Sequence, residues 1–304
     1  MNKDNIWVFG GTGFIGSHLV DSLKQNNQFR IILFVHKTLP GPKFENVITI
    51  QKELSDINET DFKSWPPQQI FHLARFGASK SILRKLSANK GKIVNSKLIE
   101  SLRSLENPPA VHYVSGSLMY GHQQNSVNED APLNPVGFAK PYINGERPFL
   151  NAKHKNLNIH FYRPGWILGP SSWFKAFFWN HYIKYNKVPY YGSGSQLMSI
   201  ISVEDCAGLI AFSSQKLDQN HDQNILLYPA ISQKEFASHI AKKLSVAIEN
   251  IPFKQIEKNY DLETAEALTS SIPLTSKNIE NISSYTPMFK SLNELLNQVI
   301  KKLS

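Results

Sequence analysis

The sequence predicts an α/β protein: a doubly wound parallel sheet, with a smaller lobe formed by its second half. Short β-branched and apolar runs alternate with helical patterns through the first half, and a glycine-rich turn follows the first of these runs. No segment repeats with a period of about 20–50 residues, which argues against a solenoid or a propeller. Strands that alternate with helices imply right-handed crossovers, and therefore a parallel sheet with helices on both faces.

The first half contains six predicted strands, in the order Ile6–Phe9, Arg30–Val35, Val47–Gln51, Gln69–Leu73, Ala110–Ser115 and Ile159–Arg163. Apolar residues at helical spacing predict helices that end near Lys24 and that cover residues 90–105 and 143–153. The second half begins with an aromatic stretch at 171–191, followed by a strand at 198–203 and helices at 205–214, 233–244 and 291–303. We therefore expect one lobe over residues 1–165, with 195–215 returning to it, and a smaller lobe over 166–304.

Composition narrows the class of protein. The chain has 304 residues, of which 41% are apolar and 19% charged, as is typical of a globular protein. Its single cysteine, Cys206, excludes an internal disulfide, and we interpret it as a core residue rather than a nucleophile. No apolar run reaches the roughly 18 residues of a membrane span, and Ile6–Phe9 is too short for a signal peptide. We expect a cytoplasmic protein.

Charge and histidine spacing exclude further classes. The net charge is +9, but the lysines are scattered and no basic arm or zinc-finger spacing is present. We therefore expect neither nucleic acid nor a membrane as a partner. The ten histidines include no His-x-x-x-His pair with a third carboxylate ligand, so no metal site is predicted.

The run Gly10-Gly11-Thr12-Gly13-Phe14-Ile15-Gly16 lies directly between the first strand and the first helix. Glycine at 10 allows a tight turn, at 13 it lets backbone N–H groups approach a pyrophosphate, and at 16 it lets the helix pack close to the sheet. The positive end of the helix dipole then faces the phosphates. The run predicts a Rossmann-type dinucleotide site with Gly10, Thr12, Gly13, Phe14, Ile15 and Gly16 as its contacts. The alternative is a tight turn that binds nothing.

The end of the second strand bears on the choice of cofactor. An acidic residue there would accept a hydrogen bond from the ribose 2′-OH and favour NAD. The sequence has Val35-His36-Lys37 instead, and Lys37 can pair with a 2′-phosphate. This favours NADP over NAD, unless both His36 and Lys37 point to water.

Together with the glycine run, six further motifs resemble the extended short-chain dehydrogenase/reductase superfamily, specifically its NAD-dependent epimerase/dehydratase group. The resemblance runs from about residue 5 to residue 215. In chain order the motifs are Asp56-Ile57, Phe71-His72-Leu73-Ala74, Asn95, Ser115-Gly116-Ser117-Leu118-Met119-Tyr120-Gly121, Arg163-Pro164-Gly165 with Gly169-Pro170, and Gly192-Ser193-Gly194-Ser195-Gln196 with Val203-Glu204-Asp205.

The resemblance implies an oxidoreductase-type fold that binds NAD(P) in the first lobe and a small-molecule substrate in the second. It implies that Asp56 and Ile57 touch the adenine. The other implied cofactor contacts are Leu73, Ala74, Asn95, Pro164 and Gly165, the last two near the nicotinamide. Relatives often dimerise through helices beside the active site, so a homodimer is a further expectation.

Three other side chains lie in or after predicted strands near the site. Arg75 comes after the fourth strand, at the carboxyl edge where ligands of such sheets bind, and is the best candidate cation for an anionic group. His72 is interpreted as a structural histidine that faces the cofactor. His122 follows Tyr120-Gly121 and is a weaker candidate for the cleft.

The segment expected to carry the chemistry departs from the family. Relatives use a tyrosine and, four residues later, a lysine whose charge lowers the pKa of the phenol. No Tyr-x-x-x-Lys occurs between 134 and 147. One register puts Phe138 at the tyrosine and Tyr142 at the lysine, and the other keeps Tyr142 as the tyrosine and puts Glu146 at the lysine. In both the acid/base pair is incomplete.

The hydroxyl that orients the substrate is also displaced. Its usual position, four residues before Tyr120, is Gly116, and Ser115 and Ser117 flank it. Our catalytic candidates are therefore Tyr142, as the proton donor, with Ser115 or Ser117 orienting the substrate oxygen.

The substrate expectation rests on Met198, which lies where nucleotide-sugar relatives carry a phosphate-binding arginine. We therefore expect epimerase, dehydratase or reductase chemistry on a small carbonyl or hydroxyl compound rather than on a typical nucleotide sugar. The aromatic stretch from Trp173 to Trp179 would suit a hydrophobic substrate, although packing in the core or at a dimer face is the favoured interpretation. The alternative function is a cofactor-binding protein without redox chemistry, such as a sensor, a partner subunit or a non-redox enzyme.

Overall fold

The computed structural model describes residues 3–36, 41, 44–77, 81–216 and 222–304. Internal contacts divide the chain into two compact units. Unit 1 comprises residues 1–115, 141–162 and 207–223, and unit 2 comprises residues 116–140, 163–206 and 224–304. Residues 116–140, which the sequence places in the first lobe, thus group with unit 2. The assignment of a cofactor lobe and a substrate lobe stays a prediction.

A seven-stranded sheet has the order β11-β6-β5-β4-β1-β2-β3 among the described residues. The pairs from β6 to β3 are parallel. The strands are β1 (Asp4–Phe9), β2 (Phe29–Val35), β3 (Ile48–Gln51), β4 (Pro67–His72), β5 (Ala110–Val114), β6 (Ile159–Pro164) and β11 (Gln223–Ile225). The order reverses at β1, as in doubly wound sheets, so the predicted fold class is confirmed.

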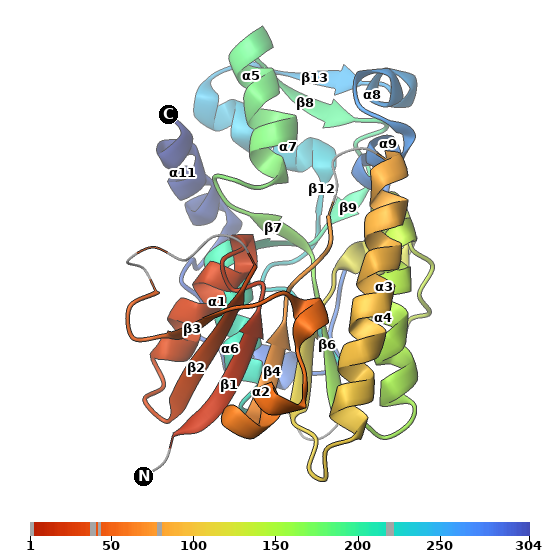
Figure 1. Ribbon diagram of the computed structural model, residues 1–304. Helices are drawn as coiled ribbons and strands as arrows, with labels where there is room; N and C mark the ends of the chain where they lie inside the picture. The colour runs from red at the N-terminus through yellow and green to blue at the C-terminus, as the bar shows by residue number, and fades with distance from the viewer. Residues whose placement is uncertain (1–2, 37–40, 42–43, 78–80, 217–221) are drawn as a thin grey trace. The chain divides into compact units, whose positions relative to one another are not determined.

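Helices alternate with these strands along the chain, as their sequence pattern predicts. They are α1 (Phe14–Lys24), α2 (Glu59–Ser64), α3 (Ser81–Arg103), α4 (Ala139–Lys153) and α6 (Val203–Ser213), and a 3₁₀ turn, η2 (Leu54–Asp56), follows β3. In Figure 1, α3 and α4 run side by side, and the Asn95 side chain donates to the Gly145 carbonyl oxygen between them at 2.7 Å. Helix α3 begins earlier than predicted, because exposed Leu83 and Leu86 break its apolar periodicity.

The core of unit 1 is aromatic around β1. Trp7 is fully buried and stacks on Phe62, with ring centroids 4.6 Å apart. Its indole N–H donates to the Trp65 carbonyl oxygen at 2.8 Å, so the buried polar atom is satisfied. Phe9 and Phe34 pack beside it across β1 and β2. A central parallel strand buried on both faces accounts for this continuous apolar run.

Unit 2 is built from short elements. Its strands form two-stranded sheets: β7 (Trp166–Leu168) with β10 (Ile200–Ser202), β9 (Leu197–Met198) with β12 (Ile231–Ser232), and β8 (Lys187–Tyr191) with β13 (Ala247–Ile251). The single strand predicted at 198–203 is therefore two strands, and Val203 already begins α6. The helical segments are η3 (Ser117–Tyr120), a π-helical turn η4 (Lys175–Trp179), α5 (Asn180–Tyr185), α7 (Gln233–Leu244), α8 (Phe253–Asn259), α9 (Leu262–Thr269), α10 (Ile279–Ser283) and α11 (Leu292–Leu303).

The aromatic stretch of unit 2 packs in its core. Phe174 and Phe178 are buried and lie against Phe236 of α7. This confirms the favoured interpretation of these residues as core. Cys206 is also fully buried, and burial raises the pKa of its thiol, which suits an inert core residue.

Within the described ranges, no helix combines the length and the apolar character needed to cross a membrane. In the same part of the chain, no three His, Cys, Asp or Glu side chains are grouped so as to hold a metal ion.

Candidate functional site

The turn after β1 requires glycine at its first position. Gly10 has a φ of +78°, in the left-handed region that favours glycine. A Cβ atom at this residue would lie 2.7 Å from the Ala74 amide nitrogen and 2.8 Å from the Leu73 carbonyl carbon. The Leu73 amide in turn donates to the Phe9 carbonyl oxygen at 2.9 Å. The turn thus packs directly on the backbone that leaves β4, at the carboxyl edge of the sheet.

The start of α1 lies equally close to this turn. A Cβ at Gly16 would come within 2.1 Å of the Gly10 carbonyl oxygen, and the Gly13 amide already donates to that oxygen at 3.0 Å. The N-cap residue, Gly13, makes no side-chain cap, and the first turn carries no acidic residue. The helix therefore presents backbone amides and the positive end of its dipole without a competing anion. This cradle fits the pyrophosphate of a dinucleotide.

A carboxylate lies beside the end of β2, although the sequence shows none there. The Glu53 Oε1 atom lies 2.6 Å from Nε2 of His36, and its Oε2 atom lies 4.0 Å from the ammonium group of Lys90. Sequence analysis missed Glu53 because it comes 17 residues after His36 and reaches β2 only through the pairing of β2 with β3. Lys37, on which the preference for NADP rests, lies outside the described residues.

The predicted adenine contacts lie nearby in the chain. Asp56 ends the turn η2 and is exposed, with its carboxylate accepting a hydrogen bond from the Ser55 hydroxyl at 3.1 Å. Ile57 packs against the apolar core of unit 1. An exposed acidic residue next to a half-buried aliphatic one is compatible with the expected contact.

A buried hydrogen-bond chain ties β4 to α3 and α4. Nε2 of His72 lies 3.0 Å from Oδ1 of Asn95, whose amide donates to the Gly145 carbonyl oxygen. Burial lowers the pKa of His72 to about 4, while the hydrogen bond to Asn95 acts in the opposite direction. A neutral, buried imidazole agrees with the structural interpretation of His72. The Asn95 side chain is engaged in this bridge.

Arg75 and Tyr142 meet beyond the end of β4. The guanidinium carbon of Arg75 lies 4.7 Å from the centroid of the Tyr142 ring, within cation–π range. A Cβ built on Gly77 would lie 3.9 Å from the Tyr142 hydroxyl. The structure therefore brings together two residues that sequence analysis selected separately, one as a cation and the other as a proton donor.

Ser115 and Glu146 form a second close pair, at the end of β5. The Ser115 hydroxyl donates to Glu146 Oε2 at 2.5 Å, and Glu146 is fully buried. Glu146 lies one helical turn after Tyr142 in α4, whereas Phe138 lies just before that helix. Whichever register applies, the α4 side chain that contacts Ser115 at the end of β5 is the carboxylate of Glu146. The sequence shows Glu146, but only the fold shows its contact with Ser115.

The remaining candidates belong to unit 2. Ser117 is buried in η3, and Pro164 is the last residue of β6. A Cβ on Gly165 would lie 2.1 Å from the Ser199 carbonyl oxygen, so this glycine permits the close approach of β7 and β10. His122 Nδ1 accepts a hydrogen bond from the Ser271 amide. Met198 is buried in the apolar core.

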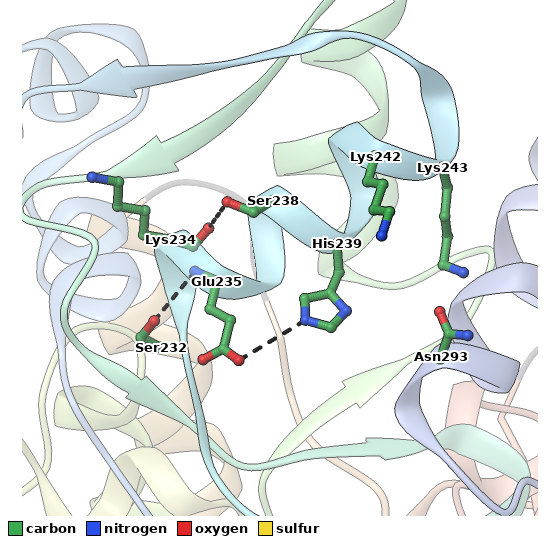
Figure 2. Close-up of a pocket in the computed structure, with 8 residues that line it drawn as sticks. All are labelled: Ser232, Lys234, Glu235, Ser238, His239, Lys242, Lys243 and Asn293. Carbon is green, nitrogen blue, oxygen red and sulfur yellow. Dashed lines mark hydrogen bonds and ion pairs between the residues drawn. The ribbon is translucent and has the colours of Figure 1, made fainter.

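A separate hollow of about 950 Å³ lies on unit 2, along α7 (Figure 2). It is lined by Ser232, Lys234, Glu235, Ser238, His239, Lys242, Lys243 and Asn293. None of these is a candidate from the sequence, and the lining is made mainly of one exposed helix face. The strand ends of unit 1 therefore remain the better candidate site.

Comparison with known proteins places the chain in a family. Residues 6–226 match the NAD dependent epimerase/dehydratase family. The chain is also similar to a putative UDP-glucose 4-epimerase of Methanocaldococcus jannaschii, with 28% identity over 141 residues that cover 43% of this chain and 45% of that protein. The chain spans about half the length of the curated relatives it matches.

Two solved structures have the same fold over nearly the whole chain. Human epimerase family protein SDR39U1 with NADPH has a TM-score of 0.78 at 18% identity, covering 98% of this chain and 100% of that one. The dTDP-glucose 4,6-dehydratase of Bacillus anthracis in complex with NAD has a TM-score of 0.75 at 19% identity, covering 98% and 96%. The nucleotide-sugar names among these proteins give no support to the expectation drawn from Met198. Because the family match extends over most of the sequence, this chain belongs to the NAD dependent epimerase/dehydratase family.

Proposed function

We propose that this chain binds NAD(P) at the glycine turn of unit 1 and acts on a small hydroxyl or carbonyl compound in an epimerase, dehydratase or reductase type of reaction. The observation that carries the proposal is the turn itself. Gly10 and Gly16 sit where any Cβ would collide with backbone, and α1 begins beside them with no side-chain cap. Family membership agrees with a dinucleotide at this position.

When bound, the cofactor supplies a hydride acceptor or donor, and the protein supplies position and proton handling. The amides at the start of α1 hold the pyrophosphate. Arg75, exposed beyond β4, binds an anionic group of the substrate or the cofactor. Tyr142, beneath Arg75, donates a proton to the substrate oxygen or accepts one from it. Ser115 orients that oxygen, with Ser117 as the alternative, and Pro164 and Gly165 are assigned to the nicotinamide side.

Two features bear on the choice between NAD and NADP. Lys37 would attract a 2′-phosphate, and on this basis the sequence favours NADP. Glu53, held beside the end of β2 by His36, would accept a hydrogen bond from a ribose 2′-OH and repel a 2′-phosphate. The described residues therefore favour NAD. Direct titration with both cofactors decides whether the charge of Glu53 or that of Lys37 determines the choice.

The substrate is proposed as a small molecule with a hydroxyl or carbonyl group. Met198 is buried in the core, so it offers no charge to a substrate phosphate. The relatives' names nevertheless make UDP-glucose and dTDP-glucose the first compounds to test. Binding of either one would show that this chain holds a diphosphate without an arginine at residue 198.

The test is a titration of the purified protein with NADH and NADPH, followed by nicotinamide fluorescence. We expect saturable binding of at least one of them, and its loss in Gly16→Ala, because the added methyl group would collide with the Gly10 carbonyl oxygen. Gly41→Ala is the matched control, since a Cβ there meets nothing within 4 Å. Binding of neither cofactor by a folded protein free of copurified nucleotide would refute the proposal.

A second candidate function keeps the cofactor but not the redox chemistry. It is favoured by the residues of α4, where no lysine follows a tyrosine by one turn and a buried glutamate faces β5 instead. Such a protein would bind NAD(P) as a sensor, as a partner subunit or as a non-redox enzyme. It predicts tight cofactor binding with no turnover of any hydroxyl or carbonyl compound.

A further inference from the structure

The hollow along α7 is lined by polar and charged side chains only. Its volume of about 950 Å³ lies within the range of small-molecule sites, but such sites are usually lined mainly by apolar side chains. Three of the lining residues are lysines and one is a glutamate, so the lining carries a net positive charge. A ligand of this hollow would therefore be recognised through charge and hydrogen bonds, and it would be an anion.

The positive charge is concentrated at the end of the hollow formed by the last turn of α7. Lys242 and Lys243 come three and four residues after His239, so both lie beside it on the helix surface. Figure 2 shows these three side chains on the same side of the hollow as Asn293 of α11. The carboxylate of Glu235 lies 3.9 Å from Nε2 of His239, and its residue is about 12 Å from Lys243 along the helix axis. The glutamate therefore leaves the two ammonium groups without a partner.

The helix does not use these lysines to cap its own end. Ser245 follows α7 in the left-handed region, and its amide donates to the Ala241 carbonyl oxygen, so the backbone caps the helix. The ammonium group of Lys243 donates to Oδ1 of Asn297 at 2.6 Å, a neutral partner that orients the charge without cancelling it. Within the described part of the chain, no carboxylate forms an ion pair with Lys242 or Lys243. Their charges are available to a ligand.

We propose that this end of the hollow is a binding site for a diphosphate group, made of residues that the glycine turn does not share. Lysine ammonium groups bind phosphates as point charges, and Lys242 and Lys243 supply two of them. The amide of Asn293 and the ring of His239 add hydrogen-bond donors of a different geometry. A diphosphate offers enough oxygens and negative charge to engage all four side chains, whereas a carboxylate does not. Free pyrophosphate and a nucleoside diphosphate both present this group.

The experiment titrates the purified protein with inorganic pyrophosphate and, separately, with ADP, and follows the imidazole signals of His239 by NMR. His239→Gln identifies these signals among those of the ten histidines. We expect both ligands to shift the signals in a saturable manner, and the shifts to persist in Gly16→Ala, in which the glycine turn is obstructed. Equal affinities would indicate a site for the diphosphate group alone, and tighter binding of ADP a site for a nucleotide; both results support the proposal.

Lys242→Gln combined with Lys243→Gln should weaken the binding of pyrophosphate by about tenfold or more at low salt, because both ammonium groups are lost. The matched control is Lys254→Gln with Lys258→Gln, which removes the same charge from exposed lysines of α8 outside the hollow and should leave the affinity unchanged. Equal weakening in the two double variants would show attraction to the overall charge only, and would overturn the inference. So would unshifted His239 signals in the wild type at millimolar pyrophosphate, whether or not any variant folds. Because the signal comes from His239, a failure to bind NAD(P) would leave this test intact.

Discussion

Lowering the pH from 7 to 5 is expected to destabilise unit 1 through His72, which is 1% exposed in β4. Burial lowers the pKa of its imidazole from the ordinary value of 6.5 to about 4. The unfolded chain therefore takes up a proton near pH 6.5, while the folded protein stays neutral there. The stability contributed by His72 is complete above pH 6.5 and is lost as the pH falls from 6.5 toward 4. Over the 1.5 units down to pH 5, at about 1.4 kcal/mol per unit, the loss is about 2 kcal/mol.

His112 adds to this loss with the same sign. Burial lowers its pKa well below the ordinary value, and the neighbouring His160 lowers it further. The rings of His112 and His160 stack with centroids 5.0 Å apart across β5 and β6, so one protonation opposes the other. Nδ1 of His112 also lies 3.1 Å from the Tyr162 hydroxyl oxygen. His112 therefore stays neutral inside the folded sheet, and its protonation in acid favours the unfolded chain.

The assay is urea unfolding at pH 7 and at pH 5, followed by circular dichroism. In His72→Gln, the loss of unfolding free energy between the two pH values should be smaller than in the wild type by about 2 kcal/mol. All other groups titrate alike in both proteins, so the difference isolates His72. His154→Gln, which removes an exposed histidine, is the control and should behave as the wild type. An equal loss in His72→Gln and the wild type would refute the reasoning.

Two further predictions concern the site. Glu53→Gln should raise the affinity for NADPH relative to NADH by about five- to tenfold, because it removes a negative charge beside the end of β2. Titration with both cofactors measures the ratio of the two affinities. An unchanged ratio would place the 2′ position of the ribose away from Glu53. If the register that puts Phe138 at the tyrosine and Tyr142 at the lysine is correct, Phe138→Tyr combined with Tyr142→Lys should create or raise carbonyl reduction. The absorbance of NADPH measures this activity. No change in turnover with the fold intact would count against that register, and Tyr142→Phe with undiminished turnover would exclude Tyr142 as the acid.

The sheet could be predicted because its signals are local. Strand β1 is a short apolar run that leads straight into the glycine turn, and the parallel sheet follows from the alternation of strands with helices. Glycine is required at positions 10 and 16 because a Cβ would meet backbone atoms. At Gly16 these atoms belong to the same turn, and at Gly10 they belong to the residues that follow the neighbouring strand β4. Unit 2 was harder to predict, because strands of two or three residues such as β9 and β10 leave no periodic pattern.

The charged pairs of the site could not be predicted, because they join residues that are distant in sequence. Glu53 reaches His36 across the pairing of β2 with β3, and Ser115 meets Glu146 across 31 residues. Asn95 could be matched to a family position, but its engagement with His72 and Gly145 depends on how α3 packs. Sequence analysis thus identifies chemical groups, whereas the partner of each group is a property of the folded chain.

The way the chain alternates between its two units has a consequence for biosynthesis. Unit 1 draws on three separate segments, and the last of them ends at residue 223. A nascent chain that has emerged only as far as β5 therefore lacks α4, β6 and α6, and cannot yet complete unit 1. Domains that are continuous in sequence can fold one after another on the ribosome. Here the two halves must mature together, and fragments cut at residue 165 should be prone to aggregation.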